Sequence, residues 1–380
     1  MKRVPPAVEE AVDSLPLSQV ARRRLLTGAG LFSASMAASA LLAGCAEGGT
    51  QSEGGGDDGG VGDFPSTPKW KFVFVNHVTT NPFFVPTNYG AADACALLGL
   101  PKYQWTGSQE SKIGEMVAAV NSAVSAQADG IAVSVVDVNA FAQPVDNALD
   151  KGIPVVSYNA DGAVDNPGTN RLGYIGQDLF TSGMELGRRI AELVDEGPVV
   201  GFIATPGQLN IQPRIDGARQ AIKESGKNIQ FDQIATGAQL PEELSRIDAY
   251  YQGHQDVKGM FAVDAGSTQM LGQVMAKYKL KDKGVVAGGF DLVPETLQAI
   301  KEGHLDFTID QQPYLQGFLP VLYLYLYKLS GGLLTPPNTN TGLAFVTKDN
   351  VDAYLTQETR FQGSSKEQKL IERSGPIPHA

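Results

Sequence analysis

Short apolar runs alternate with longer stretches of helical character along most of this chain, starting at about Lys69. Runs of four to eight apolar residues rich in Val and Ile are typical of parallel strands that are buried on both faces. The helical stretches include Ser111–Gln127 and Asp178–Val194. This alternation predicts strand–helix units that assemble into parallel sheets. The six runs are Phe72-Val73-Phe74-Val75, Gly130–Val136, Ile153–Tyr158, Val199–Ala204, Gly259–Val263 and Val285–Phe290.

The length of the chain favours two such sheets over one. A single hydrophobic core stops growing at about 250–300 residues, and this chain has 380. We therefore expect two α/β lobes, each built on a doubly wound parallel sheet. The content of 42% hydrophobic and 19% charged residues is that of a soluble globular protein.

The first 44 residues carry the pattern of an export signal. Arg22, Arg23 and Arg24 precede an uncharged run, residues 27–44, that is rich in Ala, Ser, Gly and Leu. The arginines resemble a twin-arginine signal, although Ala21 stands where Ser or Thr is usual, and general secretion is the alternative route. An uncleaved anchor helix would need about 20 apolar residues, and this run is short and rich in Gly and Ser.

Leu42-Ala43-Gly44-Cys45 resembles the bacterial lipobox. That resemblance implies that the sulfur of Cys45 takes a diacylglycerol and that Cys45 becomes the first residue after cleavage. The protein would then be exported and lipid-anchored, at the outer face of the cytoplasmic membrane or in the periplasm, and would touch the membrane only through its lipid. Residues 45–68, dominated after Cys45 by Gly, Ser, Thr, Asp and Glu, have the composition of a flexible linker.

Charge and missing motifs exclude several classes of function. The net charge is −11, and five Lys and Arg against three Asp and Glu in residues 1–44 leave −13 on the remainder, so we expect no nucleic-acid partner. No GxxxxGK loop, GxSxG turn, HExxH helix or CxxC pair occurs, and the four histidines are scattered. We therefore expect no catalytic residues, no cofactor and no metal site. Cys95, the second cysteine, lies on an apolar helical stripe and is expected to be a buried residue.

Polar and aromatic residues stand where the predicted strands end, and open α/β sheets bind ligands beyond those ends. Asn81-Pro82-Phe83-Phe84 follows the first strand, where rings can face a sugar and an amide can bond its hydroxyls. The alternative is a pair of core phenylalanines behind a turn. Asn159, Asp264 and Asp291 end later strands, and their alternative role is helix N-capping, which suits Asp291 before Leu292-Val293-Pro294.

Two more polar side chains lie at positions that need a partner. Arg214 opens a predicted helix, where the helix dipole disfavours a cation unless another group binds it. Gln311 precedes a Pro turn, where its amide can donate and accept hydrogen bonds to adjacent hydroxyls, with an exposed turn amide as the alternative.

Together these fragments resemble the ribose-type periplasmic sugar-binding family, in consistent order from about Trp70 to Tyr354. The family's Asn-Pro-Phe-Phe, Arg-x-x-Gly, Gly-Phe-Asp and Gln-x-Pro are matched at residues 81–84, 214–217, 289–291 and 311–313. The resemblance implies a substrate-binding protein of an ABC importer, monomeric, with its permease as protein partner. It also implies ligand contacts from Asn81, Phe83, Phe84, Asn159, Arg214, Asp264, Asp291 and Gln311.

Two departures argue against ribose itself as the ligand. Asn159-Ala160 stands where ribose binders carry Asp-Arg, and Asp264 stands where they carry Asn. Losing the Arg removes a fork of donors, and replacing Asn by Asp exchanges a donor for an acceptor, so the pattern of hydroxyls must differ. The expected ligand is a sugar or polyol, and another pentose or a hexose fits equally.

The resemblance further implies that the chain crosses between the lobes near residues 176–178, 311–312 and 341–342, and that the lobes enclose the ligand by hinge closure. The expected lobes are residues 69–176 with 312–341 and residues 177–311 with 342–360, followed by a polar tail, 361–380. Two alternative functions remain. One is a sugar-sensing receptor component, and the other is a secreted carbohydrate-active enzyme in which Asp264 and Asp291 pair as acid and base.

Overall fold

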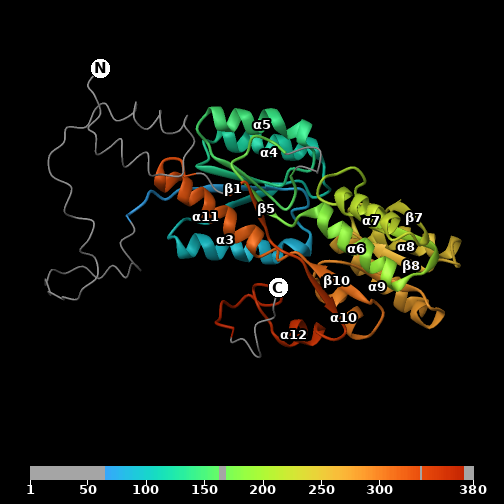
Figure 1. The fold of residues 1–380 in the computed structure, drawn as a ribbon. Coiled ribbons are helices and arrows are strands. Elements are labelled where there is room, and N and C mark those ends of the chain that lie inside the picture. Colours follow the sequence, from blue (N-terminus) through green and yellow to red (C-terminus); the bar gives the residue numbers. More distant parts are fainter. Residues whose placement is uncertain (1–64, 162–167, 334–335, 372–380) are drawn as a thin grey trace, which may run out of the picture. The chain divides into compact units, whose positions relative to one another are not determined.

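The computed structural model describes residues 65–161, 168–333 and 336–371 (Figure 1). The chain divides into residues 1–65 and 66–380, and the elements described below all belong to the second unit. The predicted export signal and Cys45 lie outside the described residues. Within the described ranges, none of the helices combines the length and apolar character needed to cross a bilayer.

The first lobe is built on a six-stranded sheet with the order β11-β5-β4-β3-β1-β2, in which every pairing is parallel. Along β1, Phe72 and Phe74 face one side of the sheet while Val73 and Val75 face the other, as the alternation of a strand requires. Helices α3 and α11 cover the phenylalanine side, and α4 and α5 cover the valine side. The bounds are β1 Phe72–Asn76, α3 Val85–Leu97, β2 Gln104–Gly107, α4 Ile113–Ser125, β3 Gly130–Val133, α5 Val138–Asp150, β4 Val155–Tyr158, β5 Tyr174–Gly176, α11 Leu315–Ser330 and β11 Asn338–Asn340.

The second lobe repeats this plan with the order β12-β10-β9-β8-β6-β7, where only β12 runs antiparallel to its neighbour among the described pairings. Helices α6 and α7 pack on one side of the sheet, and α8, α9 and α10 pack on the other. The predicted fold class of two doubly wound α/β lobes is confirmed. The bounds are α6 Leu179–Leu193, β6 Glu196–Ile203, α7 Gln212–Glu224, β7 Asn228–Ala235, α8 Leu240–Gly253, β8 Gly259–Ala262, α9 Ala265–Lys277, η2 Leu280–Lys283, β9 Val286–Phe290, α10 Pro294–Lys301, β10 Phe307–Asp310, β12 Ala344–Thr347 and α12 Val351–Thr356. The first lobe also has a 3-10 turn, η1 Pro82–Phe84, between β1 and α3.

The chain passes between the two sheets in three segments. It leaves the first sheet after β5 and enters the second lobe at α6, it returns between β10 and α11, and it crosses again between β11 and β12. Each lobe is therefore assembled from separate parts of the sequence. The three segments lie together, because Gln177 Nε2 donates to the carbonyl oxygen of Gly342 at 3.2 Å and Gln312 Nε2 donates to that of Thr341 at 2.6 Å. A rotation about them therefore changes the distance between the lobes without unfolding either one.

Glycines allow the two helices on the phenylalanine side of the first sheet to touch through their backbones. A Cβ at Gly317 of α11 would lie 1.9 Å from the carbonyl oxygen of Thr87 in α3, and one at Gly90 of α3 would lie 2.1 Å from the carbonyl oxygen of Tyr314. No larger side chain fits at such distances. This contact holds the start of α11 against the start of α3.

The segment after α12 lies against α3 and the residue that precedes α11. Arg360 pairs with Asp93 at 3.0 Å, and Gln368 donates to the same carboxylate at 3.0 Å. The ring of Phe361 lies 4.6 Å from that of Tyr314, centroid to centroid. The described part of the predicted polar tail, residues 361–371, therefore contacts the first lobe through Phe361 and Gln368.

Candidate ligand-binding site

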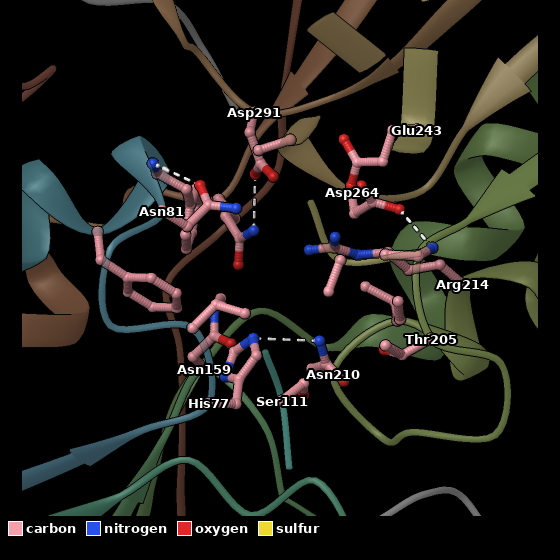
Figure 2. Close-up of a pocket in the computed structure, with 18 residues that line it drawn as sticks. His77, Asn81, Ser111, Asn159, Thr205, Asn210, Arg214, Glu243, Asp264 and Asp291 are labelled. Atoms are coloured by element: carbon pink, nitrogen blue, oxygen red, sulfur yellow. Dashed lines mark hydrogen bonds between the residues drawn. The ribbon is translucent and has the colours of Figure 1, made fainter. Parts of the chain in front are cut away.

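A cavity lies between the lobes, beyond the carboxyl ends of strands from both sheets (Figure 2). It holds about 520 Å³ of space that no atom fills, part of which is open solvent. All eight residues that the sequence singled out as ligand contacts line this cavity. They are Asn81, Phe83, Phe84, Asn159, Arg214, Asp264, Asp291 and Gln311.

Three residues of the cavity wall have a left-handed backbone. The φ angles are 60° at Ser111, 62° at Asn159 and 78° at Asp291. This conformation is rare outside glycine and is best tolerated by Asn and Asp. Asn159 and Asp291 therefore suit these strand ends, and their side chains turn into the cavity (Figure 2). Left-handed residues gather where a ligand site requires them.

The Asn-Pro-Phe-Phe segment forms the short helix η1 at one side of the cavity. Oδ1 of Asn81 accepts a hydrogen bond from the backbone N–H of Phe83 at 2.9 Å, so its Nδ2 remains available to donate. The rings of Phe83 and Phe84 meet edge to face, with centroids 4.7 Å apart. Phe84 also packs against Trp105 in the core of the first lobe. Both sequence interpretations of the phenylalanines, core and cavity, therefore apply.

A relay of side-chain amides joins the two lobes beneath the cavity. Nδ2 of Asn159 donates to Oε1 of Gln316 at 3.0 Å, and Nε2 of Gln316 donates to Oε1 of Gln311 at 3.0 Å. Nε2 of Gln311 then donates to Oδ1 of Asp291 at 2.7 Å. Among the described residues, none donates a hydrogen bond to Oδ1 of Asn159 or Oδ2 of Asp291, so both can accept from a ligand. Gln316 is fully buried and was not predicted from the sequence. A single amide side chain in the otherwise apolar stretch of α11 could have indicated it.

Arg214 enters the cavity from the start of α7 and is 2% exposed. Its Nη1 donates to the carbonyl oxygen of Val263 at 2.8 Å, and its Nη2 donates to Oε1 of Gln177 at 3.0 Å. The guanidinium also lies 4.0 Å from the ring centroid of Phe290. These contacts are the partners that its helix position required, and each Nη keeps a second hydrogen for a ligand.

Asp264 caps α9 while it lines the cavity. Its Oδ1 accepts from the backbone N–H of Ser267 at 2.9 Å, and its Oδ2 accepts from that of Ala204 at 3.0 Å. Asp291 does not cap the helix that follows it, because the N-cap of α10 is Val293. The capping interpretation is therefore right for Asp264 and wrong for Asp291.

Burial shifts the pKa values of the charged groups around the cavity. It raises the pKa of Asp291 to about 7, against the lowering effects of Arg214 and the hydrogen bond from Gln311. Burial also raises the pKa of Asp264, which its backbone hydrogen bonds and Arg214 oppose. The pKa of Arg214 is lowered by burial and supported by the two acids, and a guanidinium remains charged under such conditions.

Several residues of the rim were not predicted, and they join the lobes across the mouth of the cavity. Nδ2 of Asn210 donates to Nε2 of His77 at 3.2 Å, which leaves Nδ1 of His77 to donate to Ser134 Oγ at 2.9 Å. Burial lowers the pKa of His77 to about 3, so the ring is neutral. The sequence showed only scattered histidines, because the partner of His77 comes from the other lobe.

Four further hydrogen bonds accompany this pair, and we call the whole set the latch. The backbone N–H of Leu209 donates to the carbonyl oxygen of Val136 at 2.9 Å, and Gln239 Nε2 donates to that of Gln109 at 3.3 Å. Gln208 Nε2 donates to the carbonyl oxygen of Ser111 at 3.1 Å, and Gln208 Oε1 accepts from Ser111 Oγ. Because the latch spans the mouth of the cavity, the lobes are in a closed arrangement.

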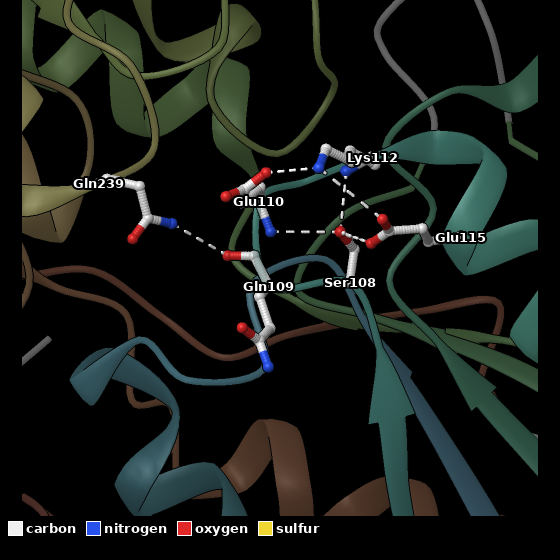
Figure 3. A network of polar contacts seen from close by, with 6 residues as sticks. All are labelled: Ser108, Gln109, Glu110, Lys112, Glu115 and Gln239. Atoms are coloured by element: carbon white, nitrogen blue, oxygen red, sulfur yellow. Dashed lines mark hydrogen bonds and ion pairs between the residues drawn. The ribbon is translucent and has the colours of Figure 1, made fainter.

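The loop of residues 108–112, whose Gln109 and Ser111 carbonyl oxygens accept latch hydrogen bonds, has hydrogen bonds of its own (Figure 3). Oγ of Ser108 donates to Oε2 of Glu115 at 2.7 Å and accepts from the backbone N–H groups of Glu110 and Lys112 at 3.2 and 3.0 Å. These bonds fix residues 108–112, so the carbonyl oxygens of the loop face the second lobe in one arrangement.

The family model of the periplasmic binding protein domain matches residues 72–331. The chain belongs to the periplasmic binding protein family. This binding protein is 51% identical over 315 residues to the xylose/arabinose-binding protein XylF of Sulfolobus acidocaldarius, which covers 80% of this chain and 77% of the relative. It is 28% identical over 243 residues to the ribose import binding protein RbsB of Haemophilus influenzae, covering 64% and 80% of the two chains.

Solved structures resemble this periplasmic binding protein over both lobes. A solute-binding protein of an ABC transporter from Burkholderia graminis, in complex with D-arabinose, has a TM-score of 0.70 at 25% identity and covers 77% of this chain and 99% of its own. GanP, a glucose-galactose binding protein from Geobacillus stearothermophilus, shares the fold with a TM-score of 0.67 at 23% identity, covering 75% and 99%.

These likenesses decide against the enzyme that the sequence left open as an alternative. The predictions of a type I periplasmic binding protein, and of a binding protein rather than an enzyme, are confirmed. The family also implies a location outside the cytoplasm. The eight predicted ligand contacts surround one cavity, and their contact with a ligand stays a prediction.

Proposed function

We propose that this protein captures a monosaccharide, of the aldopentose class, and delivers it to an ABC importer. The observation that carries the proposal is the set of free hydrogen-bonding positions around the cavity. Asn81 Nδ2 and the second hydrogens of the Arg214 Nη atoms are donors, and Asn159 Oδ1 and Asp291 Oδ2 are acceptors. A sugar hydroxyl both donates and accepts, so a ring of hydroxyls suits such a mixed set.

The aromatic side of the cavity supports the same ligand class. Phe83 and Phe84 offer apolar surface on the side where Asn81 begins η1. A sugar ring has C–H faces that pack on phenyl rings while its hydroxyls point outward to polar groups. The aldopentose class is favoured because the XylF relative, 51% identical, is named for xylose and arabinose. The departures at Asn159 and Asp264 from the ribose pattern agree with a pentose other than ribose.

Closure of the lobes would couple binding to delivery. A sugar held between Asn81 of the first lobe and Arg214 of the second adds bonds across the cavity to those of the latch, and so favours the closed arrangement. Closure also excludes water, which strengthens each remaining hydrogen bond. The permease would recognise the closed pair of lobes on a monomer, and no covalent step is needed.

Binding is tested with the protein purified without its export signal and freed of sugar by unfolding and refolding. Thermal unfolding is recorded with D-xylose, L-arabinose, D-ribose, D-glucose, xylitol and L-alanine. A ligand at a hundredfold excess over its Kd adds about 2.7 kcal/mol of stability. Xylose or arabinose should give this shift, and Arg214→Ala should abolish it. Arg219→Ala, on the exposed side of the same helix, is the matched control that should retain it.

Each alternative outcome has a meaning. A shift with xylitol alone would move the proposal to polyols, and a shift with L-alanine alone would refute a sugar ligand. No shift with any of the six compounds would refute the proposed ligand class.

The proposed lipid tether is tested in cells. Labelling with a radioactive fatty acid should mark the wild-type protein and fail to mark Cys45→Ser, which should appear in the medium or as a soluble exported form. Uptake of labelled pentose should fall when the gene is deleted. Normal uptake with a lost transcriptional response to pentose would instead favour the sensing receptor.

A further inference from the structure

Glu243 is a buried carboxyl that no sequence motif singled out. It lies on α8, is 2% exposed and lines the cavity between the lobes. Its Oε2 is buried without a hydrogen-bond partner among the described residues. A buried carboxylate without a donor is costly, so this group is either protonated or completed by a ligand.

The charged groups that face Glu243 are acidic. Asp264 faces it from the start of α9, as Figure 2 shows, and Glu242 precedes it on its own helix. Arg214, on α7, acts instead on Asp264 and Asp291. Burial, with the charges of Asp264 and Glu242, raises the pKa of Glu243 to about 9.

Within this pair of acids the proton belongs on Glu243. Both oxygens of Asp264 accept backbone N–H bonds, from Ser267 and Ala204, which stabilise its charged form. Glu243 has no such donors in the described structure. When two neighbouring carboxyls differ in this way, the one without donors keeps the proton and can itself donate a hydrogen bond.

The surrounding backbone leaves room for this carboxyl at the edge of the cavity. A Cβ at Gly266, in the first turn of α9, would lie 2.2 Å from Oε2 of Glu243 and 2.6 Å from Oε1. Only glycine at this position lets the carboxyl lie between α8 and α9 beside Asp264. An apolar side chain would fill the same space without leaving an unpartnered oxygen, so packing alone does not explain an acid here.

We propose that Glu243 is a neutral carboxylic acid that donates a hydrogen bond to a ligand hydroxyl, while Asp264 beside it accepts one from the ligand. The pair then selects hydroxyl groups, because a hydroxyl accepts from one partner and donates to the other. This inference rests on the proposed sugar-binding function and adds to it a specificity-determining residue from α8.

The test is the pH dependence of sugar affinity. Calorimetric Kd values are measured from pH 6 to pH 10 for the wild type, Glu243→Gln and Glu243→Leu, with the aldopentose that binds most tightly. Because the acid must be neutral to donate, the wild type should lose affinity above pH 9, approaching tenfold per pH unit relative to Glu243→Gln. The glutamine variant keeps a donor and should retain at least about a tenth of the wild-type affinity at pH 7, whereas the leucine variant should lose more than about tenfold.

Glu242→Gln, at the exposed neighbouring acid, is the matched control and should keep an alkaline fall, which begins at a somewhat lower pH because the charge of Glu242 contributes to the raised pKa of Glu243. The inference is overturned if Glu243→Gln follows the same pH profile as the wild type, or if Glu243→Leu binds as tightly at pH 7. If the leucine variant fails to fold, the pH profiles of the wild type and Glu243→Gln still test the inference. If the wild type binds no sugar at any pH, the proposed function fails first and this inference fails with it.

Discussion

His77 makes closure of the lobes sensitive to acid. In the closed arrangement its Nε2 accepts from Asn210, and its buried ring has a pKa of about 3. Opening removes Asn210 and admits water, which returns the pKa of the ring to its ordinary value of about 6.5. Since the pKa is depressed in the closed form, closure is fully favourable above pH 6.5 and weakens as the pH falls towards 3.

The size of this loss of closure at acid pH can be calculated for the uptake of one proton by His77. Each pH unit below 6.5 multiplies the population of the protonated open form by about ten, which is about 1.4 kcal/mol per unit. At pH 5 the open form gains a factor of about 30, or about 2 kcal/mol. Sugar affinity, which requires closure, should fall by the same factor.

His77→Gln keeps an amide that can accept from Asn210 but cannot be protonated at these pH values. We expect the ratio of wild-type Kd to variant Kd, measured by calorimetry with the bound pentose, to rise about 30-fold from pH 7.5 to pH 5. Asp291, with its pKa of about 7, titrates in both proteins and cancels in the ratio. A ratio that stays constant over this range would refute the reasoning.

Three other substitutions test the packing and the relay. Gly317→Ala places a methyl group 1.9 Å from a backbone oxygen of α3 and should lower the free energy of unfolding by about 2–3 kcal/mol in urea titrations. The control is Gly114, a helical glycine with open space around it, and Gly114→Ala should raise the free energy of unfolding by up to about 1 kcal/mol. Gln316→Leu leaves Asn159 and one end of the relay unpartnered and should cost about 2–4 kcal/mol of stability in the same assay, so an unchanged midpoint would contradict the relay. Arg214→Lys loses the planar fork and the stack on a phenyl ring, and calorimetry should find sugar affinity at least about 100-fold weaker.

The sequence predicted the parts of the fold that local patterns determine. The strands that it marked at residues 130–136 and 153–158 correspond to β3 and β4, because a strand covered on both faces must be continuously apolar. It missed β7, whose residues alternate between exposed and partly buried positions at a sheet edge, and it missed β11, whose Asn338–Asn340 carries no apolar signal. Edge strands take their pairing from the neighbouring strand rather than from burial.

The residues of the candidate site also fall into those that the sequence predicted and those that it missed. Asn159 and Asp291 were found because each directly follows an apolar strand that is visible in the sequence, whereas their left-handed backbone was not predicted. Asn210 and Glu243 were missed because their importance comes from partners in other elements, such as His77 across the cavity and Asp264 at the next helix. The eight predicted residues surround one cavity, but the rim became visible only when the two lobes were assembled, and Glu243 only when α8 was packed against α9.

The chemistry of the latch has a consequence for the surroundings in which the protein works. Its hydrogen bonds join side-chain amides, backbone groups, a serine hydroxyl and an uncharged imidazole. Screening by dissolved ions weakens interactions between exposed charges and hardly affects bonds between neutral groups. A protein outside the cytoplasm meets water whose ionic strength it does not control. Closure through such contacts should therefore need the same amount of sugar in dilute and in saline media.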